Sequence, residues 1–151
     1  MIALQVLNAS DLDKLRELIR LYEDVFEMKD FVMPSDAHLQ LLLDKNGITF
    51  LVAEKNGKVV GGLTAHDLPS TYFEANEVYV YDLAVAKNYQ RTGIGKKLLE
   101  ELAAICKRKG EREFFLQADI DDQHALDFYR STGGIAENVI HFSYATKNKF
   151  E

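Results

Sequence analysis

Residues 79–85 are Tyr-Val-Tyr-Asp-Leu-Ala-Val, and residues 90–95, after a four-residue turn, are Gln-Arg-Thr-Gly-Ile-Gly. The first stretch has the composition of a strand and carries one carboxylate, Asp82, while a strongly helical segment opens directly from the second. Gly93 and Gly95 have no Cβ, so the backbone there can approach a ligand closely. The free N–H groups at the start of a helix favour an anion. The stretch therefore predicts a strand followed by a phosphate-binding turn and a helix.

The turn does not match the two common nucleotide-binding motifs. It lacks the Gly-Lys-Ser/Thr of a Walker loop. Leu98 stands where the dinucleotide fingerprint has its third glycine. The anion that it binds is thus expected to belong to another kind of ligand.

The composition indicates an ordinary soluble protein of one domain, residues 1–151. The chain is 47% hydrophobic and 28% charged, and no apolar run approaches the ~20 residues of a membrane span. The N-terminus shows no basic region followed by an apolar stretch, and Cys106 alone forms no internal disulfide, so a cytoplasmic protein is expected. The net charge of −6 disfavours nucleic acid and favours cationic partners.

Hydrophobic periodicity and turn residues predict a mixed α/β domain with a largely antiparallel N-terminal half. Asn56-Gly57 between two β-rich runs is a strong hairpin signal. Four helices are expected, at 11–26, from Ser35 or Asp36 to Leu43, at 95–109 and at 123–131. Strands are expected at 1–7, 49–54, 59–66, 78–85, 114–118 and 139–145, with a looser segment at 67–76.

Three stretches resemble one group of the GNAT superfamily of N-acetyltransferases, the gentamicin (aminoglycoside) 3-N-acetyltransferases. They are Tyr79-Val-Tyr-Asp-Leu-Ala-Val, then Gln117-Ala-Asp-x-x-Asp-x-x-Ala-x-x-x-Tyr129, and the pair His141-Phe142. The resemblance covers nearly the whole chain. It implies an α/β (α+β) GNAT fold, with a mixed, mostly antiparallel central sheet of six to seven strands flanked by about four helices.

The resemblance also implies acetyl-CoA as cosubstrate and no metal. The pyrophosphate would lie on the backbone amides of residues 91–95, and the pantetheine arm would bond to the main chain of residues 83–85. The implied cofactor-binding residues are Leu83, Ala84, Val85, Gln90, Arg91, Thr92, Gly93, Ile94, Gly95, Lys96 and Tyr129. His38, His66, His124 and His141 show no metal-ligand spacing, and one cysteine cannot complete such a site.

Asp82 is the first candidate for catalysis, because a carboxylate in mid-strand is costly to bury without a partner. Simple alternation places Asp82 on the same strand face as Val78 and Val80. It would anchor a substrate ammonium or take its proton, directly or through water. The alternative is a structural partner of Arg91 or a capping carboxylate.

Tyr129 and Glu77 are the other catalytic candidates. The resemblance places Tyr129 near the cofactor sulfur, where a phenol of pKa near 10 could protonate the departing thiolate. The alternative for Tyr129 is an aromatic core residue. Glu77 is a second possible proton acceptor. Many superfamily members have an asparagine where this chain has Asp122, although the gentamicin group also has acidic residues there.

Acidic residues suggest the substrate class. The resembled fold would bring Glu74, Glu77 and Asp82 together with Asp119, Asp121 and Asp122 at one cleft mouth, which would attract a polycation. Tyr81 would wall this cleft, and an ordinary solvated acidic loop is the alternative.

The predicted activity is therefore acetylation of a primary amine of an aminoglycoside, at the 3-amino group, by direct attack. A polyamine or other small amine is an alternative acceptor. A non-catalytic module that binds acyl-CoA is the alternative from another class. The apolar faces of the central and last strands favour a homodimer.

Overall fold

The computed structural model describes residues 1–147 and divides into two compact units, Met1–Gln117 and Ala118–Glu151. The first unit holds a five-stranded sheet of order β1-β2-β3-β4-β5. Neighbouring strands are antiparallel, except that β4 and β5 are parallel. The strands are β1 (Ala3–Val6), β2 (Ile48–Lys55), β3 (Lys58–Pro69), β4 (Asn76–Val85) and β5 (Phe114–Leu116).

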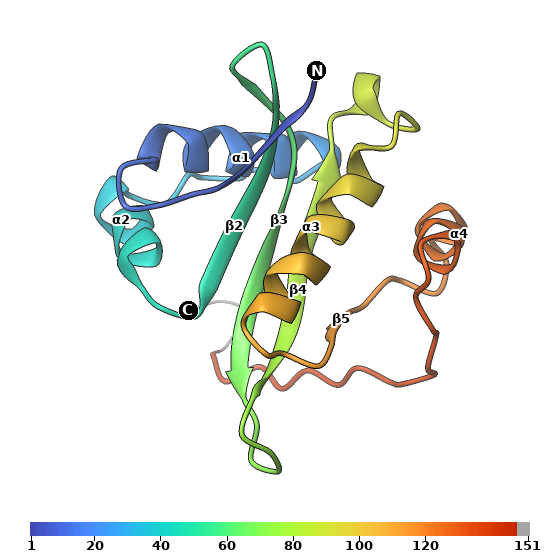
Figure 1. The fold of residues 1–151 in the computed structure, drawn as a ribbon. Helices are drawn as coiled ribbons and strands as arrows, with labels where there is room; N and C mark the ends of the chain where they lie inside the picture. Colours follow the sequence, from blue (N-terminus) through green and yellow to red (C-terminus); the bar gives the residue numbers. More distant parts are fainter. Residues whose placement is uncertain (148–151) are drawn as a thin grey trace. The chain divides into compact units, whose positions relative to one another are not determined.

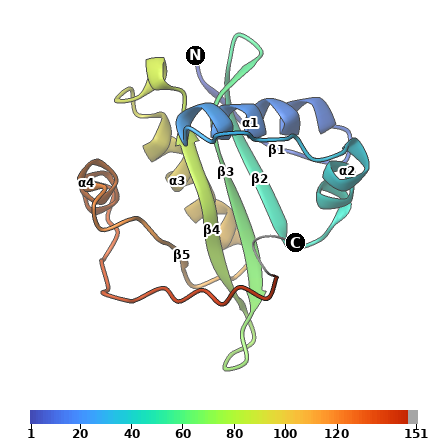
Figure 2. The same ribbon diagram turned by 180° about the vertical axis from the view of Figure 1, so that it is seen from behind.

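Three helices pack on the two faces of this sheet. The helices α1 (Leu12–Val25) and α2 (Asp36–Asp44) belong to one hydrophobic cluster, and α3 (Ile94–Arg108) packs in the other. Figures 1 and 2 show α3 and α1 on opposite faces. The periodic apolar positions predicted from sequence form these faces, including Leu15 and Leu18 of α1 and Leu98 and Leu102 of α3.

The second unit contains the short helix α4 (Gln123–Ser131), at the predicted bounds. Its N-cap is Asp122, whose side chain accepts a hydrogen bond from the backbone N–H of Ala125 at 3.1 Å. Gly133 has a φ of +99°, a value that suits glycine just after a helix.

Local signals in the sequence predicted most element boundaries correctly. Ser35 caps α2 by accepting from the backbone N–H of His38 at 3.2 Å. Asn56 and Gly57, with φ of +53° and +77°, form the β2–β3 hairpin turn. Segment 67–76 is more ordered than predicted, because β3 and β4 stay paired as far as Pro69 and Asn76.

The predicted last strand at 139–145 is wrong. Within residues 118–147 the structure contains no strand, so the sheet has five strands instead of the six to seven expected. Val139, Ile140, Phe142 and Tyr144 are at least 69% exposed. The segment has strand-like composition, but a strand also needs a paired neighbour. The expectation of a single domain over 1–151 stays a prediction.

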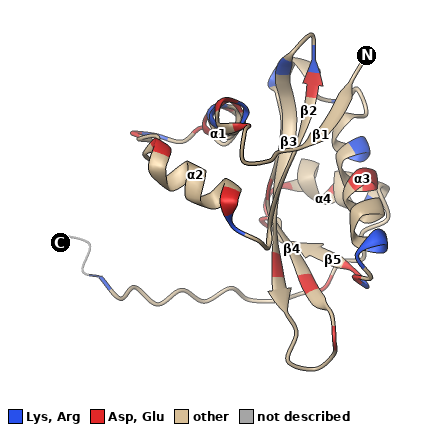
Figure 3. Cartoon of the chain, turned by 60° about the vertical axis from the view of Figure 1, so that its left-hand side comes forward, with Lys and Arg blue, Asp and Glu red and all other residues tan. Residues whose placement is uncertain are grey.

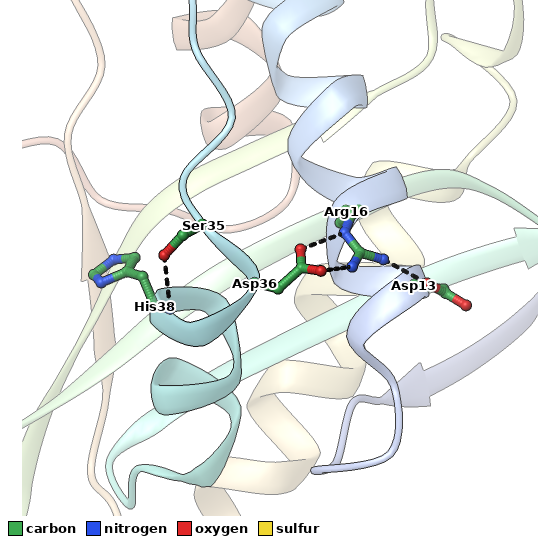
Figure 4. A network of polar contacts seen from close by, with 5 residues as sticks. All are labelled: Asp13, Arg16, Ser35, Asp36 and His38. Atoms are coloured by element: carbon green, nitrogen blue, oxygen red, sulfur yellow. Dashed lines mark hydrogen bonds and ion pairs between the residues drawn. The ribbon is translucent and has the colours of Figure 1, made fainter.

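An ion-pair network joins α1 to the start of α2 (Figure 4). The guanidinium of Arg16 contacts both carboxylate oxygens of Asp36, at 3.0 and 2.6 Å, and also binds Asp13. The fork geometry favours this pair, although its exposure to solvent keeps the stabilisation small.

No helix of residues 1–147 is both long and apolar enough to span a bilayer.

Two adjacent glycines let α1 and α3 lie close to β3. A Cβ on Gly62 would meet Leu18 Cδ1 at 2.5 Å and the carbonyl oxygen of Leu51 at 2.8 Å. A Cβ on Gly61 would meet Ile94 Cγ2 at 3.1 Å and the carbonyl oxygen of Ala84 at 3.3 Å. The packing of α1 against β3 is thus tighter than the packing of α3 against β3.

We expect Gly62→Ala to destabilise the fold by about 2 kcal/mol or more, because backbone must move to admit the methyl group. Gly61→Ala is the matched control and should cost clearly less, since its Cβ would come no closer than 3.1 Å to a side chain and 3.3 Å to the backbone. Urea unfolding of both variants measures the difference. Equal midpoints would show that α1 does not press on β3 as described.

Candidate functional site

A β-bulge in β4 sets the direction of Asp82. Thr64 of β3 pairs with Asp82, and the next residue, Ala65, pairs with Val80, so Tyr81 is the extra residue. Before the bulge, Val78 and Val80 pack in the α3 cluster; after it, Leu83 does so. The prediction that Asp82 shares a face with Val78 and Val80 is therefore wrong. Asp82 faces the α1 side.

Asp82 is half-buried among polar and aromatic neighbours. Burial raises the pKa of its carboxyl group, while hydrogen bonding to Thr64 and the nearby charge of His66 lower it. No ion pair between Asp82 and Arg91 occurs within residues 1–147. A half-buried carboxylate with a raised pKa and an open side suits proton transfer.

Four rings continue across the same face of the sheet and are called here the aromatic row: His66, Tyr81, Tyr79 and Phe115. Neighbouring centroids are 6.1, 5.8 and 4.9 Å apart in that order. Tyr81 is 66% exposed. The phenol of Tyr79 donates to Gln117 Oε1 at 3.2 Å. An exposed ring beside a carboxylate offers an ammonium ion both cation–π attraction and charge.

The second half of β4 has an open edge in the first unit. The parallel partner β5 pairs only with Val78, Tyr79 and Val80, and no other strand of residues 1–147 continues that side. Residues 81–85 can thus offer main-chain groups to an extended, amide-bearing ligand. Leu83, Ala84 and Val85 lie on this segment.

The turn after β4 has the geometry of an anion site. Arg91 and Gly93 have φ of +62° and +89°, and Gly93, the N-cap of α3, makes no side-chain cap. Backbone N–H groups at such a helix start point into the turn. Gln90 Nε2 donates to the Val85 carbonyl oxygen at 3.0 Å, and Thr92 donates to the carbonyl oxygen of Tyr89, so both side chains brace the turn.

Exposed basic side chains surround this turn. Arg91, Lys96 and Lys97 are all exposed, whereas Ile94 and Gly95 are buried against the sheet. Figure 3 shows basic segments at both ends of α3, with an acidic one between them. The charge and the free amides at the start of α3 together fit a phosphate group.

The remaining candidates lie elsewhere. Glu77 is exposed and five residues from Asp82 along β4, or about 15 Å at the usual strand rise, and its role as a second proton acceptor stays a prediction. Asp119, Asp121, Asp122 and Tyr129 belong to the second unit. Their convergence with Asp82 stays a prediction.

Within the second unit, the side chains of two of the three aspartates accept hydrogen bonds from nearby backbone N–H groups. Asp122 caps α4, and Asp119 accepts from the backbone N–H of Asp121 at 2.9 Å. Tyr129 is half-buried, and burial together with the charge of Asp122 raises the pKa of its phenol. Tyr129 is therefore protonated at neutral pH.

The sequence analysis missed two buried residues between α1 and the sheet, one of which lies opposite Asp82. Tyr22 of α1 and Thr64 of β3 are both buried and share a hydrogen bond of 2.9 Å between their oxygens. Tyr22 was predicted only as one member of an apolar helix face. A phenol among leucines was the available signal, but its partner on β3 depends on how α1 packs on the sheet.

Comparisons with known proteins show the family and the fold of the chain. The profile of the Acetyltransferase (GNAT) family matches residues 13–133. An aminoglycoside acetyltransferase from an uncultured soil metagenomic sample is 48% identical, with a TM-score of 0.95 and 97% of each chain covered; it was crystallised with trehalose, and also with sisomicin. A second soil metagenomic aminoglycoside acetyltransferase is 30% identical, with a TM-score of 0.92 over 97% of this chain and 99% of that one.

Curated sequences match over shorter lengths. N-alpha-acetyltransferase 30 of Schizosaccharomyces pombe is 33% identical over 55 residues, which are 36% of this chain and 37% of that protein. The chain spans between 34% and 46% of the length of the curated relatives it matches.

Proposed function

Since the chain belongs to the GNAT acetyltransferase family, we propose that it acetylates a primary amine of an aminoglycoside, at the 3-amino group. The observation that carries the proposal is the half-buried carboxylate of Asp82, which the bulge turns toward the exposed aromatic row. The 48%-identical soil enzyme crystallised with sisomicin supports the substrate class.

GNAT acetyltransferases use acetyl-CoA, and the residues present here fit it. The positive φ values at Arg91 and Gly93 and the uncapped start of α3 suit its pyrophosphate, with Lys96 adding charge. The open edge at residues 83–85 suits the amide groups of its pantetheine arm. Acetyl-CoA supplies the acetyl thioester and a thiolate leaving group.

The chemistry assigned to the protein is proton transfer and orientation. The amine must be neutral to attack, so Asp82 takes its proton directly or through one water. A main-chain N–H near Leu83 or Val85 polarises the attacked carbonyl group. Tyr129 donates a proton to the departing sulfur. Direct transfer is favoured because Cys106, the sole cysteine of the chain, is buried in the α3 cluster and its thiol pKa is raised by burial.

Charge and the aromatic row select the substrate in this proposal. The net charge of −6 and the exposed carboxylates of Glu77, Asp119 and Asp121 attract a polycation. Tyr81 then receives an ammonium-bearing ring beside Asp82. We place the enzyme in the cytoplasm as a homodimer, in which a second copy covers the exposed apolar residues of segment 139–144.

Release of free CoA thiol from acetyl-CoA tests the proposal, with gentamicin, kanamycin and spermidine as separate acceptors and products identified by mass. We expect turnover with gentamicin and one added acetyl group, whose nitrogen NMR then assigns. Turnover with spermidine alone would replace the aminoglycoside by a polyamine. Tight acetyl-CoA binding with no turnover on any amine would instead support a binding module.

Removal of the Tyr81 ring should weaken acceptor binding. We expect Tyr81→Ala to raise the KM for gentamicin by about five- to tenfold, which is the loss of one partly exposed cation–π contact. The KM for acetyl-CoA should not change. Tyr72→Ala, which removes an even more exposed ring from the 70–75 turn, is the control. An unchanged KM for gentamicin in Tyr81→Ala would remove the aromatic row from the substrate site.

A further inference from the structure

A polar pair interrupts the apolar packing between α1 and the sheet. Tyr22 and Thr64 are 5% and 6% exposed, and the neighbours of Tyr22 in the same cluster include Leu18 and Val52. The hydrogen bond between the two hydroxyl groups, 2.9 Å long, satisfies both of them. Phenylalanine and valine would fill this space without desolvating a polar group. The pair therefore requires a reason beyond packing.

The position of Thr64 supplies that reason. Thr64 lies directly opposite Asp82 in the β3–β4 register, and directly opposed residues have Cβ atoms about 5 Å apart. An ionised carboxylate only accepts hydrogen bonds, and a threonine hydroxyl has one proton to give. If Thr64 gives its one proton to an ionised Asp82, it must accept from Tyr22. The three side chains would then form a chain of hydrogen bonds with one direction.

We propose that Tyr22 is a positioning residue for Asp82: its phenol fixes the Thr64 hydroxyl in the orientation that donates to the carboxylate. Without this donor the Thr64 hydroxyl is free to rotate. With it, Asp82 is held in one orientation and in the ionised form that accepts a proton. The proposal rests on the function assigned above to Asp82.

The other titratable groups near Asp82 are His66 of β3 and Tyr79 and Tyr81 of its own strand. Burial raises the pKa of the Tyr22 phenol, so Tyr22 stays a donor throughout the working pH range. Burial raises the pKa of Asp82, and the Thr64 hydrogen bond opposes that rise. Loss of these hydrogen bonds would therefore raise the pKa of Asp82 further. The enzyme would then need a higher pH to bring Asp82 into its ionised, active form.

The test is the pH dependence of kcat/KM in four proteins: the unmodified enzyme, Tyr22→Phe, Thr64→Val and Thr64→Ser. We expect the acid limb of Thr64→Val to move up by about one pH unit, the value of one hydrogen bond to a charged group. The acid limb of the Tyr22→Phe profile should move up by about half a pH unit. In this variant Thr64 remains, but its hydroxyl is no longer polarised by a hydrogen bond from Tyr22. Rates on the high-pH plateau should change little.

Thr64→Ser separates positioning from packing. Serine keeps the hydroxyl and loses the methyl group, so this variant should lose thermal stability and keep the acid limb in place. Valine keeps the volume and loses the hydroxyl, so it should move the acid limb, and it should also lose stability because the buried Tyr22 phenol is left without its partner. Limbs that coincide in all four proteins, with activity falling only as thermal stability falls, would show that the pair is core packing and overturn the proposal.

A second readout keeps this test separate from the assigned activity. NMR titration of the ¹³C-labelled Asp82 carboxyl group follows its ionisation without any amine acceptor. We expect the same upward shifts in Tyr22→Phe and Thr64→Val. An inactive unmodified enzyme would end the proposed function, and the titration would still decide whether Tyr22 acts on Asp82.

Discussion

Asp82→Asn should lower turnover by about 10²- to 10⁴-fold, the range expected for loss of a general base. Asparagine has the same shape and can still accept a hydrogen bond from Thr64, but it cannot take a proton from the amine. Acetyl-CoA binding should stay unchanged, because it is assigned to the β4 edge and the turn at residues 91–95. The acid limb of the pH profile should disappear with the carboxylate.

Steady-state kinetics and calorimetric titration of acetyl-CoA measure the two quantities. Asp67→Asn is the matched control, because Asp67 is also a half-buried strand carboxylate and forms an ion pair of 2.7 Å with Lys109. That variant should lose some stability and keep its turnover. An Asp82→Asn enzyme that loses turnover and acetyl-CoA affinity to the same extent would contradict the role assigned to Asp82.

Gly93→Ala should weaken acetyl-CoA binding by at least about tenfold, since the methyl group would stand where a phosphate approaches the start of α3. Gly93 has a φ of +89°, and no protein atom lies within 4 Å of the Cβ it lacks. The added Cβ thus meets open space in the protein itself. The expected loss comes from the ligand side and from backbone strain.

Gly110→Ala isolates the strain. Gly110 follows the other end of α3, has a φ of +77°, and also has nothing within 4 Å of its missing Cβ. Both variants should lose about 1 kcal/mol of stability, whereas the Kd for acetyl-CoA should rise only in Gly93→Ala. Equal affinities in the two variants would mean that the turn does not hold the pyrophosphate.

Local signals in the sequence were sufficient for elements that are built from neighbouring residues. Asn56-Gly57 specifies its own turn, Ser35 caps the helix that follows it, and the apolar period of α3 determines which side it buries. These features depend on propensities and spacing within a few residues, so a single sequence is enough to find them.

Features that depend on pairing could not be predicted in the same way. Alternation alone placed Asp82 beside Val80, because the extra residue at Tyr81 shows only in the register with β3. The strand-like composition of 139–145 predicted a strand, yet pairing needs a partner that composition does not name. The Tyr22–Thr64 bond joins residues 42 positions apart and depends on the packing of α1 against β3.

Because of the bulge, the alternation of side chains in β4 shifts by one residue at Tyr81. On one side of Tyr81 the odd-numbered positions, Leu83 and Val85, pack toward α3, and on the other side the even-numbered positions, Val78 and Val80, do so. Deleting one residue here would bring the two halves into a single phase and force one of them to present its apolar side chains to the wrong layer. The length of this strand is therefore under tighter constraint than the identity of Tyr81, and a gap placed here when relatives are aligned would exchange a core position for that of Asp82.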